Sequence, residues 1–200
     1  MAKITQLNTL AVSALALLTE RSMHPYEMQQ VMILRAEDRI VRITPGSLYH
    51  TVNRLEELGL VRATGTTREG NRPERTTYEI TDEGLDAFTG RVAEIVSRPV
   101  NEFPEFPMGL AQAHHLPLDV VVELLRKRLA LLHADLIVLT ASIDAMQERS
   151  LPARLWMDKR YVREAVKAEM SALTALIDDL NSGAIPWGET TMPQRDLPTT

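Results

Sequence analysis

The chain has 200 residues, enough for one large domain or two small ones that each bury a core. Its formal net charge is −5, so no overall basic field points to a nucleic-acid partner. Cysteine is absent, which excludes disulfides and thiolate metal sites and suits a reducing cytoplasm, the localisation that we expect.

Charge is not spread evenly along the chain. Between Arg39 and Arg75 seven arginines meet four glutamates, whereas residues 99–200 hold ten basic and fourteen acidic side chains. Positive charge is therefore gathered in one short segment, and the net charge of the whole chain is a poor guide to what that segment binds.

The N-terminal segment faintly imitates a signal peptide, because Lys3 precedes the uncharged residues 4–19. One basic residue and so short an apolar run are too little for a membrane span. We predict instead an amphipathic or buried helix over residues 6–21. No other window approaches transmembrane length, so we expect no membrane partner. The predicted buried side of the first helix is Leu7, Leu10, Ala11, Ala14 and Leu18.

A second helix is predicted over residues 26–37, opened by His24 and Pro25. Its inward side chains would be Met28, Val31 and Met32. Residues 40–43, three of which are β-branched, then predict a short strand.

A third helix is well marked within residues 44–60. Thr44 is a suitable N-cap, Pro45 fits the first helical turn, and Gly59 supplies a left-handed end. The buried side would be Leu48, Val52, Leu55 and Gly59, and a polar group would lie elsewhere: Ser47, His50, Thr51 and Arg54.

The polar group on this helix allows two interpretations. Small donors followed by an arginine suit base edges and phosphates, but a polar stripe on a short helix is also what ordinary solvated surface looks like. The next segment favours the first interpretation. Two strands are predicted, at residues 60–63 and 75–80, around a Gly- and Pro-containing loop that carries Arg68 and Arg72.

Thr81 would cap a fourth helix with one apolar face, made of Leu85, Phe88, Val92 and Ile95. The order helix, helix, strand, helix, hairpin is typical of a winged helix-turn-helix, which places one helix in the major groove and the hairpin beside the flanking backbone. We therefore predict a DNA-binding domain over residues 1–98, although a hairpin tip with ordinary solvated charges remains the alternative.

Residues 97–116 are irregular, with Pro99, Pro104 and Pro107 breaking any periodicity. Phe103 and Phe106 would be costly in a solvated linker, so we predict a domain junction. His114 and His115 are adjacent, but no carboxylate or cysteine lies at ligand spacing, so neither a metal nor another cofactor is expected.

An a/d heptad pattern follows and is the most regular feature of the sequence. It predicts an α-helical, coiled-coil-like dimerisation domain over residues 99–183, with residues 184–200 as a disordered tail. The seam can pair with a second helix at residues 155–180 or with another chain; a monomeric hairpin folded back on the first domain is the alternative to a dimer. The predicted dimer interface is Leu118, Val122, Leu125, Leu129, Leu132, Leu136, Leu139, Ile143 and Met146.

Three stretches carry a family resemblance: LNTLAVSALALLTERSMHPYEM, TPGSLYHTVNRLEELGLV and RTTYEITDEGL. With them the chain resembles the PadR family of bacterial transcriptional regulators, in particular its longer subgroup with a two-helix C-terminal extension. The extension is matched more loosely, by PMGLAQAHHLPLD and the heptad helix. The fold class expected is mainly α with a small β-hairpin, a winged helix-turn-helix domain followed by the helical dimerisation domain.

The resemblance implies a dimeric repressor. On the matching motif, Ser47, Tyr49 and His50 would lie near DNA, Arg54 near a phosphate, and the arginines of the hairpin on the flanking backbone. Some family members sense phenolic acids or planar hydrophobic drugs in the dimer interface, so Trp156 would either line such a cavity or belong to the core. The full predicted DNA-binding set is Thr44, Ser47, Tyr49, His50, Thr51, Arg54, Arg68, Arg72 and Arg75.

The function predicted is therefore a dimeric, sequence-specific transcriptional regulator that reads an inverted repeat of double-stranded DNA. Release by a small hydrophobic or phenolic ligand is what the resemblance adds, and the residues themselves leave such a ligand undecided. The alternative is a winged-helix protein–protein adaptor, which would have little reason to keep a cationic hairpin. An enzyme is not expected, because the sequence has no Gly-rich phosphate loop, no G-x-S-x-G and no acid–base cluster of His and carboxylates.

Overall fold

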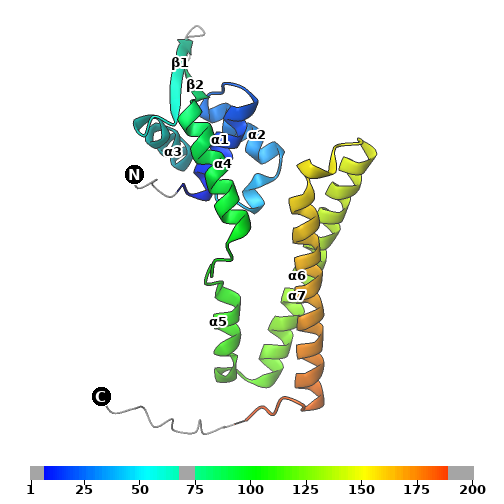
Figure 1. Ribbon diagram of the computed structural model, residues 1–200. Coiled ribbons are helices and arrows are strands. Elements are labelled where there is room, and N and C mark those ends of the chain that lie inside the picture. The colour runs from blue at the N-terminus through cyan, green and yellow to red at the C-terminus, as the bar shows by residue number, and fades with distance from the viewer. Residues whose placement is uncertain (1–6, 68–74, 189–200) are drawn as a thin grey trace, which may run out of the picture. The chain divides into compact units, whose positions relative to one another are not determined.

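The computed structural model describes residues 7–67 and 75–188. The chain forms two compact units, Met1–Asn101 and Glu102–Thr200, which are described separately. The first unit is a winged helix-turn-helix and the second a pair of long helices, so the predicted fold class is confirmed. Elements of the first unit are α1 (Thr9–Glu20), α2 (Pro25–Leu34), a 3-10 turn (Glu37–Arg39), α3 (Pro45–Glu57), β1 (Val61–Thr67), β2 (Arg75–Ile80) and α4 (Asp82–Ser97) (Figure 1).

Side-chain caps set where these helices begin. Asn8 Oδ1 accepts from the Ala11 amide at 2.8 Å, so α1 starts later than predicted and Leu7 is buried ahead of it. His24 Nδ1 accepts from the Tyr26 amide at 3.1 Å and caps α2. That helix ends at Leu34, earlier than predicted.

The strand predicted at residues 40–43 is absent from the structure. Val41 is buried, which accounts for the β-branched pattern, but the segment pairs with no neighbour as a strand. The place beside β2 is taken by Met23, whose amide and carbonyl each bond to Tyr78 at 3.0 Å. This pairing joins residues far apart in the sequence, so no local pattern announces it.

The hairpin is antiparallel, with Val61 opposite Ile80. β1 runs further than predicted, and its register shifts between Ala63 and Gly65, leaving Thr64 as an extra residue. Such a bulge increases the local twist of a strand pair. The predicted bounds of β2 are confirmed.

The start of α4 is fastened to the segment that follows α3. Thr81 donates its hydroxyl to the Gly59 carbonyl at 2.8 Å and its amide to the Leu60 carbonyl at 3.1 Å. Gly84 packs against the same carbonyl so tightly that a β-carbon there would lie 2.0 Å from the Leu60 oxygen. We call these contacts the α3–α4 joint.

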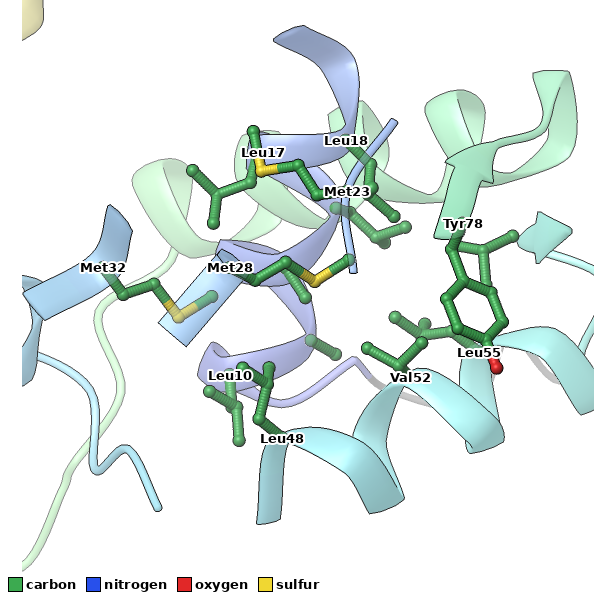
Figure 2. Packing of buried hydrophobic residues seen from close by; sticks show 14 of the residues in the cluster. Leu10, Leu17, Leu18, Met23, Met28, Met32, Leu48, Val52, Leu55 and Tyr78 are labelled. Atoms are coloured by element: carbon green, nitrogen blue, oxygen red, sulfur yellow. The ribbon is translucent and has the colours of Figure 1, made fainter. Parts of the chain in front are cut away.

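The core of the first unit is built around α1, which contacts α2, α3, α4 and β2. Ala14 and Leu15 on α1 have no exposed surface, and the small alanine lets neighbouring elements approach closely. Figure 2 shows Met28 of α2, Leu48 of α3 and Tyr78 of β2 gathered around this helix.

The second unit contains α5 (Glu105–Ala111), a 3-10 turn (Ala113–His115), α6 (Leu118–Glu148), a second 3-10 turn (Ala153–Leu155) and α7 (Met157–Ser182). α6 and α7 lie side by side along their length (Figure 1). Gly183, with φ of 77°, ends α7 in the left-handed conformation that favours glycine.

The heptad seam of α6 packs against α7 of the same chain, which is the internal pairing that the sequence allowed. Val122 and Leu125 pack with Leu173 and Ile177 of α7, and Leu139 and Ile143 pack with Trp156. All nine predicted interface residues are buried or half-buried in the single chain: Leu118, Val122, Leu125, Leu129, Leu132, Leu136, Leu139, Ile143 and Met146.

The opposite side of α6 carries a second apolar row, which we call the outer stripe: Val120, Leu124, Leu131 and Val138. These side chains are between 36% and 62% exposed. By length and composition alone, α6 could cross a membrane, contrary to the prediction that no second window approaches that length. Its inner side packs against α7, as the side of a core helix does.

The ends of the second unit are partly as predicted. Phe106 packs in the core beneath the Arg128 guanidinium, 3.7 Å from its ring centre, whereas Phe103 is 81% exposed. Of the predicted tail, Ile185 and Trp187 pack against the core of the second unit, and the Trp187 ring nitrogen donates to the Leu116 carbonyl at 3.0 Å. Residues 189–200 lie outside the described part of the chain.

Candidate nucleic-acid interface

The start of α3 is fixed by a reciprocal capping box. Thr44 Oγ1 accepts from the Ser47 amide at 3.2 Å, and Ser47 Oγ accepts from the Thr44 amide at 3.1 Å. Caps of this kind stabilise a helix by about 0.5–2 kcal/mol. The two hydroxyls predicted to face DNA are therefore engaged in holding the first turn, and the turn itself stays at the surface.

The inner side of α3 is buried against the core. Leu48, Val52 and Leu55 point from α3 toward the other elements of the first unit (Figure 2). Thr51 joins them at 8% exposure, with its hydroxyl donating to the Ser47 carbonyl at 2.8 Å. The prediction that Thr51 contacts DNA is wrong, because the helix backbone satisfies its hydroxyl and allows it to be buried.

The side of α3 that faces away from the core is a row of exposed residues at steps of four, three and four, as one helix face requires. We call it the outward row: Gly46, His50, Asn53 and Glu57. Tyr49 and Arg54 flank it and are also exposed. Sequence reasoning found His50 and missed Asn53 and Glu57, although taking the face directly opposite Leu48, Val52 and Leu55 would have found both.

Tyr49 is held in place rather than loose on the surface. Its ring meets that of His24 edge to face, with centroids 5.7 Å apart, and it remains 41% exposed. Because His24 also caps α2, the contact ties the first turn of α2 to α3. Tyr49 thus presents a fixed aromatic edge beside the outward row.

Arg54 is exposed and forms an ion pair with Glu57 at 2.9 Å. Such surface pairs contribute little free energy, so a phosphate could compete for the guanidinium. His50 and Arg54 also line an open pocket of about 170 Å³ between α3 and the start of α1.

The hairpin beside α3 is described only in part. Arg68 and Arg72 lie outside the described residues, and of Arg75 only the backbone, at the start of β2, is described. Arg62 on β1 is paired with Glu79 at 2.5 Å. At the base of the hairpin, burial raises the pKa of Tyr78, and the Glu56 carboxylate adds to this, so the phenol stays neutral.

Trp156, predicted as a possible ligand contact, is a core residue. It is 5% exposed among Leu139 and Ile143, and its ring nitrogen donates to the Leu151 carbonyl at 3.0 Å. The rings of His114 and His115 lie 4.1 Å apart. Within residues 7–67 and 75–188 no three His, Cys, Asp or Glu side chains are grouped to hold a metal ion.

Comparisons with known proteins agree with this arrangement. Bacillus subtilis PadR in complex with operator DNA matches at a TM-score of 0.73, with 19% identity over 87% of this chain and 98% of that chain. The same protein in complex with p-coumaric acid matches at 0.70, with 17% identity over 87% and 99%. A PadR-like transcriptional regulator from Bacillus cereus matches at 0.61, with 17% identity over 87% and 99%.

These likenesses establish the fold, and no curated protein matches the chain. The similarity to a known family lies in the sequence of the first unit. Residues 14–89, which run from α1 into α4 and include the whole of α3, match the family described as Transcriptional regulator PadR-like. Through these residues the first unit is similar to the PadR-like family of transcriptional regulators.

Proposed function

We propose that the protein is a homodimeric repressor that binds an inverted-repeat operator by inserting α3 of each subunit into the major groove. The observation that carries the proposal is the outward row of α3, an exposed polar face on a helix whose other side is locked into the core. A helix-turn-helix reads base edges from such a face.

Phosphate contacts would surround the row. The capped first turn of α3, with Thr44 and Ser47, would meet the backbone at one end, and Arg54 would exchange Glu57 for a phosphate oxygen. Arg68, Arg72 and Arg75 of the hairpin would contact the flanking backbone. The structure of B. subtilis PadR with operator DNA supports this placement by analogy of fold.

A dimer would use the outer stripe of α6, since the heptad seam is already filled by α7. An exposed apolar row of this kind is the usual mark of a protein–protein interface. Twofold pairing would set two reading helices about 34 Å apart, one turn of DNA, and so select a palindromic site.

We also propose that a small phenolic or hydrophobic ligand releases the protein from DNA in the cytoplasm. The support is the B. subtilis relative, which is described in complex with p-coumaric acid. Adding p-coumarate to the protein–operator complex in a gel-shift titration tests this part, and unchanged affinity up to millimolar ligand would contradict release by that compound.

The central experiment is selection of bound sites from random duplex DNA with the full chain, followed by gel-shift titration at several salt concentrations. We expect an enriched palindrome, and a log–log salt slope of about −0.9 per neutralised phosphate. Arg54→Ala should weaken binding to all sequences alike and make this slope about one unit shallower for each phosphate that is no longer neutralised.

The matched control is Arg154→Ala, which removes an exposed arginine from the 3-10 turn before α7. It should leave affinity unchanged. No enriched sequence, together with no binding even at low salt, would overturn the proposal and leave protein–protein adaptor as the remaining function for this fold.

A further inference from the structure

Asn53 is the residue of α3 whose presence the fold explains least. It is exposed, and its amide has no hydrogen-bond partner within the described residues. Asparagine is also a weak helix former, because its side chain competes for nearby backbone groups. Neither packing nor helix stability therefore accounts for an asparagine in the middle of this helix.

The position of Asn53 is fixed by the buried residues on the opposite side of α3. The preceding residue, Val52, is fully buried, and Leu55, two residues further on, is 1% exposed. The capping box holds the start of the same helix, and the contact of Tyr49 with His24 steadies its flank. The amide is thus carried on a rigid backbone, as precise recognition of a planar partner requires.

Its neighbours on the outward row leave room for a close partner. Gly46, at the start of the row, has no atom within 4 Å of where a β-carbon would sit, so the protein's own packing does not demand a glycine there. A glycine at an exposed position, where the fold itself has room for a side chain, lets a binding partner approach the helix backbone closely.

Resting on the proposed function, we propose that Asn53 is the specificity-determining residue of α3 and that it reads an adenine in each half-site. A carboxamide carries one acceptor and one donor side by side, and in the major groove adenine presents the complementary pair, the N6 amino group and the N7 acceptor. Two parallel hydrogen bonds would form, in which Asn53 Oδ1 accepts from N6 and Asn53 Nδ2 donates to N7.

The test compares site selection and affinity for the full chain and Asn53→Ala. Wild-type protein should enrich adenine at one symmetric position in each half-site. Asn53→Ala should lose that preference while keeping the others, with discrimination at this base pair falling by roughly 5- to 100-fold per half-site. Alanine favours the helix, so the variant should melt no lower than wild type, which separates a failure of recognition from a failure of folding.

A modified base sharpens the result. An operator with 7-deazaadenine at this position lacks the N7 acceptor and should bind wild type more weakly, whereas Asn53→Ala should bind both operators equally. Asn181→Ala, which changes an exposed asparagine at the end of α7, is the matched control and should behave as wild type.

The outcomes separate the two proposals. If wild type enriches a site and Asn53→Ala enriches the same bases at every position, this inference is overturned and DNA binding stands. Equal sensitivity of both proteins to 7-deazaadenine would overturn it as well. If wild type enriches no sequence at all, the proposed function fails and this inference fails with it.

Discussion

Two apolar helices of the chain, α1 and α6, differ in how much of their surface is buried. In α1 half of the twelve residues are buried, and Ala14 and Leu15 are inaccessible. In α6 only five of 31 residues are buried, and side chains as large as Leu131 stand 62% exposed. Apolar content therefore does not decide burial; the number of neighbouring elements does.

The two helices differ in how many other elements pack against them. α1 is surrounded by α2, α3, α4 and β2, so every apolar side of it finds a partner within the first unit. α6 packs mainly against α7, and one helix can cover only one side of another. The first unit completes its own core, whereas the second unit keeps an apolar surface for which an interface is the ordinary explanation.

The largest expected effect comes from the core of α1. Leu15→Ala should lower the free energy of unfolding by about 2–5 kcal/mol, because it removes buried methyl groups and leaves a cavity. The matched change Leu131→Ala removes the same atoms from the outer stripe and should cost a single subunit little. Chemical denaturation in dilute solution measures both free energies of unfolding. Equal decreases for the two variants would contradict the difference in burial between α1 and α6.

The outer stripe gives the next prediction. Leu131→Asp with Val138→Asp should abolish the dimer while leaving the helix content unchanged, because charges would be buried at the interface but not in the monomer. Sedimentation measures the assembly and circular dichroism the helices.

The control places the same charges on an exposed surface of α7 that lies outside the proposed dimer interface. Ala165→Asp with Ala168→Asp changes two exposed positions of α7 and should leave the dimer intact. A wild-type protein that sediments as a monomer, or a double variant of α6 that still sediments as a dimer, would mean that the stripe is not the interface.

The smallest effect concerns the clamp between α1 and α2. Glu20 accepts two hydrogen bonds from Arg35, at 2.6 and 2.8 Å, and this guanidinium holds the pKa of the Glu20 carboxyl below its usual range. The pair stabilises the folded state at neutral pH and loses that contribution as the pH falls through the lowered pKa. Glu20→Gln should cost less than about 1 kcal/mol at pH 7, because the pair is exposed to solvent.

Denaturation midpoints of wild type and Glu20→Gln should therefore converge in acid. A difference between the two midpoints that widens as the pH falls would contradict the stabilising role of the Glu20–Arg35 pair. Because α1 is held mainly by apolar burial, removing the clamp should not approach the loss expected for Leu15→Ala.

Local signals in the sequence predicted the elements of the first unit well. Thr44 and Thr81 mark helix starts through their side-chain hydroxyls, and Gly59 marks a helix end through its left-handed backbone; the structure confirms all three. The bridge between Met23 and β2 could not be predicted, because Met23 pairs with a residue more than fifty positions away. Local pattern carries no information about such a partner.

The sequence predicted which helix carries the candidate site, but not which face of that helix is exposed. Thr51 looks polar in the sequence, yet one hydrogen bond to the Ser47 carbonyl makes it compatible with burial, and the predicted face was consequently turned toward the core. The heptad seam shows the same limit. Its period correctly indicates that α6 pairs with a helix, but not that the helix belongs to the same chain.

The α3–α4 joint has a mechanical consequence. Two hydrogen bonds from Thr81 and the contact of Gly84 with the Leu60 carbonyl leave no slack between the end of the reading helix and the start of α4. We therefore expect a tilt of α4 to be transmitted to α3. If α3 enters the major groove as proposed, a signal that reaches α4 would change the angle of α3 there without bending α3 itself.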